Sequence, residues 1–192
     1  MLAVLSKHMA SLTVAANQSQ LVIVDVQTKL CNVMPEGAMQ AVVKNCSILA
    51  QAANMLEIPV IATEQYTQGL GETIAEVAQH LGNVKAIAKT VFSACAEPKF
   101  KAQLQRDKSQ MILTGMESHI CVLQTALDLV AMGKQVFVVE DAIISRTQEN
   151  KANAIARMRD AGCVITNTES VLFECLGSAQ HEAFKTISKL IK

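Results

Sequence analysis

A chain of 192 residues is long enough for one domain with a sizeable core and too short for two comfortable ones. Aliphatic side chains must build that core, because 51 % of the residues are hydrophobic but only 3 % are aromatic. The 17 basic residues balance the 17 acidic ones without forming a basic patch, which argues against nucleic acid as a partner, and no apolar run approaches the roughly 18 residues that span a bilayer.

Short apolar runs alternate with longer amphipathic stretches along the chain. The runs that predict strands lie at 21–24, 60–63, 84–88, 110–114, 135–139 and 163–166. Stretches with helical spacing lie at about 38–56, 73–81, 119–132, 148–161 and 179–191. This alternation predicts βαβ units with right-handed crossovers. We therefore expect a single α/β domain over 1–192, with about 1–18 as an N-terminal extension. Its doubly wound, mostly parallel six-stranded sheet would have helices on both faces, a Rossmann-like arrangement.

Sheets of this kind bind ligands in the crevice beyond the carboxyl ends of their strands, where the strand order reverses. The candidates for a site are therefore the polar residues that directly follow an apolar run. They are Asp25, the segment 63–65, Lys89, the turn 115–121 and the pair 140–141.

Cys121 follows the fourth run and should lie in the first turn of a helix. Unpaired N–H groups and the helix dipole there would lower the pKa of a thiol and could stabilise an oxyanion. The alternative is that Cys121 is a buried small hydrophobe, as free cysteines commonly are. The other five cysteines have no position at a strand end that favours catalysis.

Asp25 and Lys89 also end apolar runs. Near Cys121, the carboxylate could accept the thiol proton and later give it to a leaving amine, and the lysine could keep that carboxylate ionised or stabilise a thiolate. Alternatively, Asp25 caps a turn and Lys89 is an exposed lysine at the start of a loop. Together the three would supply the nucleophile, base and orienting group for acyl transfer.

Three segments resemble, in order and spacing, the signatures of the isochorismatase-like cysteine hydrolases. They are VDVQ at 24–27, KTVFSA at 89–94 and GMESHICV at 115–122. The segments 64–66 and 69–71 resemble the branch named for the isochorismatase domain-containing proteins. The resemblance implies that Asp25 is the general base and acid, Lys89 the electrostatic partner and Cys121 the nucleophile.

The resemblance also implies a cis peptide between Met116 and Glu117, which would aim the N–H groups of Glu117 and Cys121 into one oxyanion hole. Nicotinamidases of the family hold a metal through an Asp and two His in the loop after the second strand. The corresponding loop here, 64–68, contains no His, so we predict no catalytic metal and no cofactor. True isochorismatases hydrolyse a vinyl ether and generally lack the cysteine.

These features predict a metal-free cysteine hydrolase that cleaves a small amide-type or ureido-type C–N bond through a thioester on Cys121. Gln27, Gln65, Tyr66 and His119 are predicted to line the pocket for this small-molecule substrate. Two alternatives stay open: vinyl ether hydrolysis with the thiol as a bystander, and a non-catalytic oligomeric scaffold with the same fold.

The six cysteines form no CxxC pair, which indicates reduced thiols in a cytoplasmic setting. Mitochondrial import is the alternative, because the first two dozen residues contain no acid. A neutral, apolar-rich chain tends to self-associate, so we expect a homo-oligomer, either a dimer or a tetramer.

Overall fold

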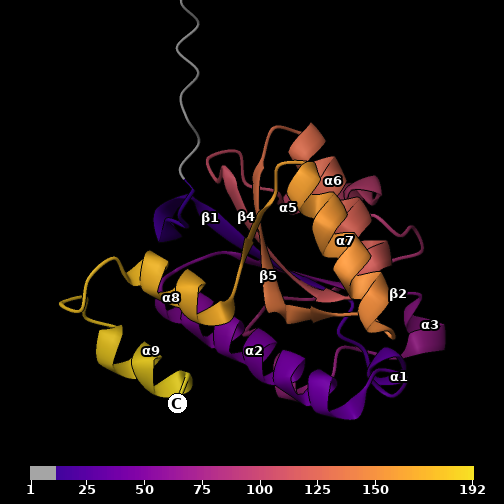
Figure 1. Ribbon diagram of the computed structural model, residues 1–192, viewed down its shortest axis with the longest axis horizontal. Helices are drawn as coiled ribbons and strands as arrows, with labels where there is room; N and C mark the ends of the chain where they lie inside the picture. Colours follow the sequence, from indigo (N-terminus) through magenta and orange to yellow (C-terminus); the bar gives the residue numbers. More distant parts are fainter. Residues whose placement is uncertain (1–11) are drawn as a thin grey trace, which may run out of the picture.

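A six-stranded parallel sheet forms the centre of the computed structural model, which describes residues 12–192 (Figure 1). The strand order is β3-β2-β1-β4-β5-β6, and it reverses between β1 and β4. The strands are β1 (Ser19–Val24), β2 (Val60–Gln65), β3 (Ile87–Lys89), β4 (Gln110–Met116), β5 (Gln135–Ile144) and β6 (Val164–Thr166). The predicted doubly wound α/β fold is confirmed.

Helices cover both faces of the sheet. They are α1 (Thr28–Cys31), α2 (Glu36–Met55), α3 (Thr67–Leu70), α4 (Ala75–Ala78), α5 (Pro98–Gln103), α6 (Leu123–Ala131), α7 (Gln148–Asp160), α8 (Thr168–Leu176) and α9 (Phe184–Leu190). Two 3₁₀ turns, η1 (Ala16–Gln18) and η2 (Ala94–Ala96), and one π-helical turn, η3 (Ser118–Val122), complete the elements. None of the helices in residues 12–192 is long and apolar enough to cross a membrane.

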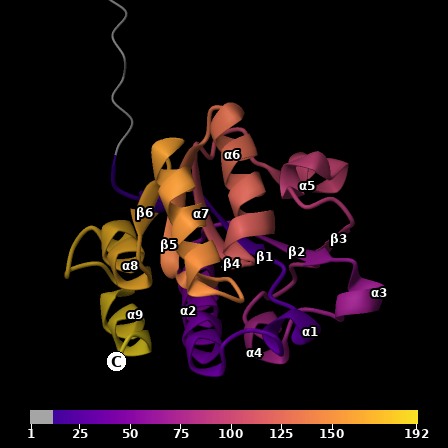
Figure 2. The same ribbon diagram turned by 45° about the vertical axis from the view of Figure 1, so that its right-hand side comes forward.

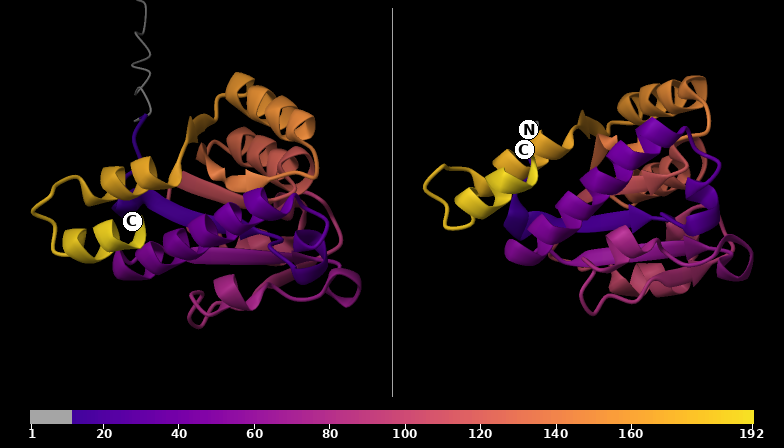
Figure 3. Two further views of the ribbon diagram at one scale, coloured as in Figure 1. Left: turned by 60° about the horizontal axis from the view of Figure 1, so that its bottom comes forward. Right: turned by 90° about the horizontal axis from the view of Figure 1, so that it is seen from below.

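The inner strands of the sheet supply alternate side chains to two separate cores, because successive residues of a strand point to opposite faces. On β1, Leu21 and Ile23 pack with α2, α4, α8 and α9, whereas Val22 and Val24 pack with α5, α6 and α7. Figure 2 shows α6 and α7 above the sheet and α2 below it. The pair α8 and α9 lies at one end of the molecule, beside the C-terminal half of α2 (Figure 3).

The structure differs from the expected elements in β5 and where an element is short or lies at an edge. The strand β5 continues to Ile144, beyond the predicted 135–139, so the candidate pair 140–141 lies inside a strand and not after one. The third predicted strand, 84–88, is reduced to 87–89, because the chain before it turns through a hydrogen bond from the Val84 N–H to the Leu81 carbonyl. The helices α1, α3, α5 and α8 were not predicted. Of the expected N-terminal extension, residues 1–11 lie outside the described residues, and 16–18 form η1.

Candidate active site

Asp25 follows the last residue of β1, a strand that is buried along its whole length. Its backbone has a positive φ of 52°, a conformation that Asp tolerates better than most residues because its short polar side chain bonds locally. The carboxylate is fully buried; Oδ1 accepts a 2.7 Å hydrogen bond from the Thr63 hydroxyl and Oδ2 accepts one of 2.7 Å from Lys89 Nζ. Because a buried carboxylate without partners is costly, these two donors hold it in place.

Lys89 ends β3, and its ammonium group is enclosed by oxygen atoms. Besides Asp25, Nζ donates to Oε1 of Gln65 at 2.8 Å and to the carbonyls of Val91 at 3.3 Å and Phe92 at 3.2 Å. The side chains of the Lys89–Asp25 ion pair have no exposed surface. The arrangement fits the rule that buried charges occur only when they are paired and hydrogen-bonded.

Cys121 lies in η3, between β4 and α6, and is only 7 % exposed. The pKa of its thiol is raised to about 12, chiefly by burial; the charge of Asp25 also raises this pKa, whereas the charge of Lys89 lowers it. The structure therefore brings the three predicted residues together. The expected lowering of the thiol pKa by the helix terminus is wrong, because desolvation outweighs it.

The turn that carries Cys121 is π-helical rather than α-helical. The carbonyl of Glu117 accepts hydrogen bonds from the N–H groups of Ile120 at 3.1 Å and Val122 at 3.2 Å. An α-helix would instead pair that carbonyl with the N–H of Cys121, four residues on. The peptide bond between Met116 and Glu117, immediately before the turn, is cis.

Gly115 fixes the distance between the nucleophile's turn and the strand that carries Asp25. It pairs with Val24 in the sheet and has a φ of +111°. A Cβ atom at this position would lie 2.6 Å from the Val24 backbone nitrogen and would clash with the carbonyl oxygen of the same residue. Only glycine therefore lets the ends of β1 and β4 approach this closely.

Two of the four predicted pocket residues, Gln27 and Gln65, form hydrogen bonds to other groups of the site. Gln27 is fully buried; its amide nitrogen donates to the carbonyls of Gln65 and Gly71, and its amide oxygen accepts from the Gln65 N–H. Gln65 uses its own amide to accept from Lys89 and to donate to the Thr90 carbonyl at 2.9 Å. Both side-chain amides are therefore committed to protein partners.

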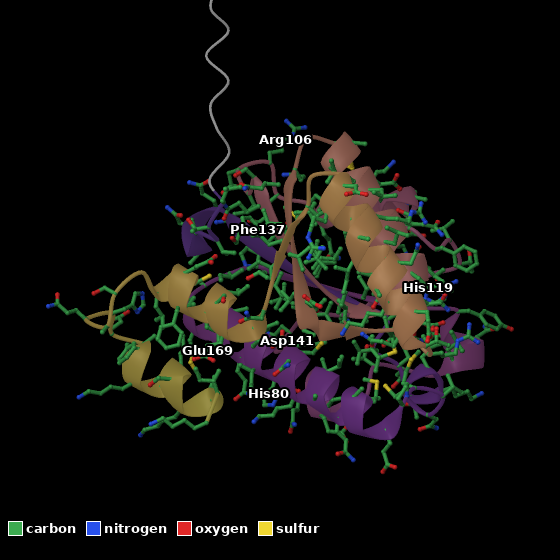
Figure 4. All side chains as sticks on the ribbon, in the orientation of Figure 1. His80, Arg106, His119, Phe137, Asp141 and Glu169 are labelled. Carbon is green, nitrogen blue, oxygen red and sulfur yellow. The ribbon has the colours of Figure 1, made fainter. Side chains whose placement is uncertain are left out.

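The other two, Tyr66 and His119, keep part of their surface open. Tyr66 is 56 % exposed, has a left-handed backbone with φ 39°, and packs its ring against Gly69. Nδ1 of His119 forms a 2.9 Å hydrogen bond with the Ser145 hydroxyl. Figure 4 shows His119 on the side of the molecule where α7 begins. Tyr66 directly precedes α3, whereas His119 lies in η3, the turn that also carries Cys121.

A cavity of about 350 Å³ lies between the loop that follows β2 and the end of β3. It is lined by Tyr66, Thr67, Gln68, Ala88, Lys89, Thr90 and Glu97. Apolar side chains close to it are exposed, among them Phe92 at 54 %. The cavity therefore lies beside Lys89 and has Tyr66 in its lining, whereas neither Asp25 nor Cys121 lines it.

The carboxylate of Glu64, near the site, accepts hydrogen bonds from other groups of the protein. Glu64 accepts from the N–H of Thr73 at 2.7 Å and from its hydroxyl at 2.8 Å, which closes the 66–73 loop. In the described part of the chain, no three His, Cys, Asp or Glu side chains gather in a group that could hold a metal ion.

Sequence reasoning missed the contacts between the loops. Thr63 was within a candidate segment, but its bond to Asp25 depends on the register of β1 and β2. Glu117 forms an ion pair with Arg146 that no sequence pattern indicated. The Ser118 hydroxyl is the one buried side-chain polar atom, among residues 12–192, for which the structure shows no hydrogen-bond partner.

The sequence of the chain is similar to that of known proteins over most of its length. The profile of the family described as Isochorismatase domain matches residues 19–170. Isochorismatase domain-containing protein 2 from Bos taurus is 34 % identical over 179 residues, which cover 93 % of this chain and 85 % of that protein. Isochorismatase family protein 1B from Dictyostelium discoideum is also 34 % identical, and the match covers 91 % of this chain and 86 % of that protein.

Solved structures with the same fold include two informative relatives. MAR1 ribonuclease from Caenorhabditis elegans has a TM-score of 0.87 and 34 % identity, over 93 % of this chain and 92 % of that one. YcaC from Pseudomonas aeruginosa, solved with hexane-2,5-diol and covalent acrylamide, has a TM-score of 0.87 and 25 % identity, over 93 % of this chain and 91 % of that one.

Proposed function

The chain belongs to the isochorismatase family of hydrolases, in the branch of the isochorismatase domain-containing proteins, and from this premise we propose that it cleaves a small C–N bond through a thioester on Cys121. The bond is of the amide or ureido type. The observation that supports this proposal most is the position of the thiol. Its pKa is affected by the charges of both members of a fully buried ion pair.

The first step is proton transfer from sulfur to Asp25. The thiol is protonated at neutral pH because burial raises its pKa to about 12, so it needs a base at the moment of attack. The proton passes to the Asp25 carboxylate as Sγ bonds to the substrate's carbonyl carbon, and the electron pair of the C=O bond moves onto oxygen. Because Asp25 becomes neutral in this step, Lys89 is left to stabilise the negative charge on sulfur and then on the intermediate.

The N–H groups of Glu117 and Cys121 hold the resulting oxyanion in this proposal. The π-helical turn supports this role, because the Glu117 carbonyl is paired with the N–H groups of Ile120 and Val122 and not with that of Cys121. Preorganised donors of this kind contribute about 10²- to 10³-fold to the rate of acyl transfer.

Collapse of the intermediate breaks the C–N bond, and the amine leaves with the proton from Asp25. A water molecule then gives a proton to the same carboxylate as its oxygen attacks the thioester. The C–S bond breaks to release the acid, and Asp25 returns this proton to sulfur, which restores the thiol and the carboxylate. The same aspartate therefore serves as base and acid in turn. No step in this sequence is assigned to a metal or a cofactor.

Of the four predicted pocket residues, Tyr66 and His119 remain as substrate contacts. Gln65 acts on the reaction through Lys89, to which its side chain is bonded. Gln27 takes a positioning role in place of the predicted substrate contact, since its amide is committed to the 65–71 loop. The cavity beside Lys89 suits a small molecule.

YcaC from Pseudomonas aeruginosa was solved with covalent acrylamide, which reacts with nucleophiles through its C=C bond, so it supports a reactive nucleophile in this fold but not C–N cleavage as such. Vinyl ether hydrolysis is less favoured here, because it gives the thiol no role. Another relative is a ribonuclease. RNA suits this chain less well, because its formal net charge is zero and its thiol and ion pair are buried.

Ammonia release tests the proposal. We expect at least one compound in a panel of small primary amides and ureido compounds to be hydrolysed by the wild type and not by Cys121→Ala. Cys163→Ala is the matched control, because Cys163 is a buried thiol of the same core. Equal loss in both variants, or hydrolysis that survives Cys121→Ala, would refute the thioester. A parallel incubation with isochorismate and RNA separates the alternative substrates.

The oligomeric state and the cellular compartment of the protein are also proposed here. We propose a homo-oligomer of two or four subunits, because apolar side chains such as Val33 (56 % exposed) and Phe92 are open to solvent. Light scattering of the purified protein tests this. A cytoplasmic site of action is supported by free cysteines in all six positions.

A further inference from the structure

Two side-chain contacts join the turn that carries Cys121 to the connection between β5 and α7. Oε2 of Glu117 accepts hydrogen bonds from the backbone N–H and from Nε of Arg146, both at 3.1 Å. Two residues further on, His119 is bonded to the Ser145 hydroxyl. We refer to these two contacts as the brace.

The brace connects the nucleophile's turn to a rigid element. Arg146 directly precedes Thr147, whose side chain caps α7 by accepting from the N–H of Asn150. The helix α7 has 13 residues and packs against η3. The carboxylate of Glu117 therefore fixes the turn relative to the start of a helix that is itself capped and packed.

The exposure of the two partners is unequal. The Glu117 side chain is 7 % exposed, whereas that of Arg146 is 56 % exposed. Neither the Glu117 carboxylate nor the Arg146 guanidinium adds apolar surface to a core. Burial of an unpaired carboxylate lowers the stability of the fold, so Glu117 needs a partner. Most ion pairs with an exposed partner contribute little to stability, so a role in holding geometry explains the contact better than one in folding.

We propose that Arg146 is a positioning residue for the oxyanion hole. It acts through Glu117, whose carboxylate it holds and whose backbone N–H is one of the two proposed donors. This inference rests on the proposed function. Loss of the guanidinium leaves the Glu117 carboxylate with only the backbone N–H of residue 146, which lets the turn shift while both donors of the oxyanion hole remain present. Because a displacement of about 1 Å at a reacting centre costs about 10²-fold in rate, we expect acylation of Cys121 to slow by about 10- to 100-fold.

The test uses the full chain and p-nitrophenyl acetate as the probe, and it follows acetylation of Cys121 by intact mass and by the burst of p-nitrophenol. Arg146→Met should lower the maximal acylation rate with little change in the half-saturating probe concentration. Arg157→Met is the matched control, since Arg157 is exposed on α7 and its side chain forms no polar contact within the described residues. Its rate should stay within about twofold of the wild type.

Chemical rescue separates positioning from stability. Because the Arg146 side chain is largely exposed, added guanidinium ion can enter the place it vacates and should restore acylation of Arg146→Met, whereas sodium chloride at equal ionic strength should not. The wild type and Arg157→Met should gain nothing from guanidinium. Thermal melts of the three proteins are recorded alongside.

Acylation of Arg146→Met at the rate of Arg157→Met would overturn the inference. A slower rate that guanidinium does not restore, together with a matching fall in melting temperature, would also overturn it and assign Arg146 to folding. If the wild type forms no acetyl adduct on Cys121, the proposed function fails and this inference fails with it.

Discussion

Lys89 Nζ lies 2.7 Å from Oδ2 of Asp25, and neither side chain has any surface open to solvent. The pair joins residues 64 positions apart in the sequence. It places one positive and one negative charge next to the Cys121 thiol, with opposite effects on the thiol pKa. The net charge of the group is zero before the proposed proton transfer and zero after it, because the negative charge moves from Asp25 to sulfur.

The free thiol should react slowly with simple alkylating agents at neutral pH. Burial raises the pKa of Cys121 to about 12, so the neutral form dominates below that pH and the thiolate fraction rises about tenfold with each pH unit. We expect the rate of Cys121 carbamidomethylation by iodoacetamide to increase from pH 7 to 10 without a plateau. Peptide mass spectrometry measures this rate, and a plateau near pH 7 would indicate a thiolate at rest.

Breaking the ion pair should cost more stability than removing it whole. Lys89→Met leaves a buried carboxylate without its cation, which typically costs about 3–5 kcal/mol. Asp25→Asn leaves the ammonium group in a similar position. We expect the double variant Asp25→Asn, Lys89→Met to be more stable than the sum of the two single losses predicts, as measured by urea unfolding in a double-mutant cycle. Additive losses would show that the two charges are not coupled.

Gly115→Ala should be far more destabilising than an equivalent change elsewhere. Its Cβ would clash with the Val24 backbone, in addition to the strain of a positive φ. Gly133→Ala is the control: this glycine has a φ of +80° but no atom within 4 Å of an added Cβ. We expect Gly133→Ala to lose about 1 kcal/mol of unfolding free energy and Gly115→Ala to lose several times more. Similar losses would contradict the close approach of β1 and β4.

Gln65→Met should slow the chemistry through Lys89. The variant removes one acceptor from the ammonium group, and a hydrogen bond to a charged group contributes about 1.5–3 kcal/mol. We expect acylation of Cys121 by p-nitrophenyl acetate to fall about tenfold or more. Gln180→Met serves as the control, because Gln180 is exposed, lies outside the cavity beside Lys89 and has no side-chain hydrogen bond in the described residues. An equal rate in both variants would remove Gln65 from the site.

Much of the fold could be predicted because long elements carry their pattern in every residue. The strands β1, β2 and β4 are largely buried, and each contains an apolar run of three or four residues. The helix α8 was missed, although Asn167 caps its first turn and Gly177 ends it with a positive φ of 63°. The helix α5 has a similar signal, since Glu97 caps it and Pro98 opens it.

The positions of Asp25, Lys89 and Cys121 could be predicted for a general reason: polar residues that follow buried strands meet at one edge of a parallel sheet. The pKa of Cys121 could not, because desolvation depends on atoms from several segments. The hydrogen bond between Glu117 and Arg146 could not be predicted from the sequence, since the two residues are 29 positions apart and only the folded turn brings them together.

The most direct measurement is acid-quenched mass spectrometry of the intact protein during turnover of an amide or an activated ester. We predict one acyl group per chain in the wild type, mapped by peptide digestion to Cys121 and absent from Cys121→Ala. An acyl group on another cysteine, or hydrolysis with no adduct on any residue under the same quench, would contradict the thioester.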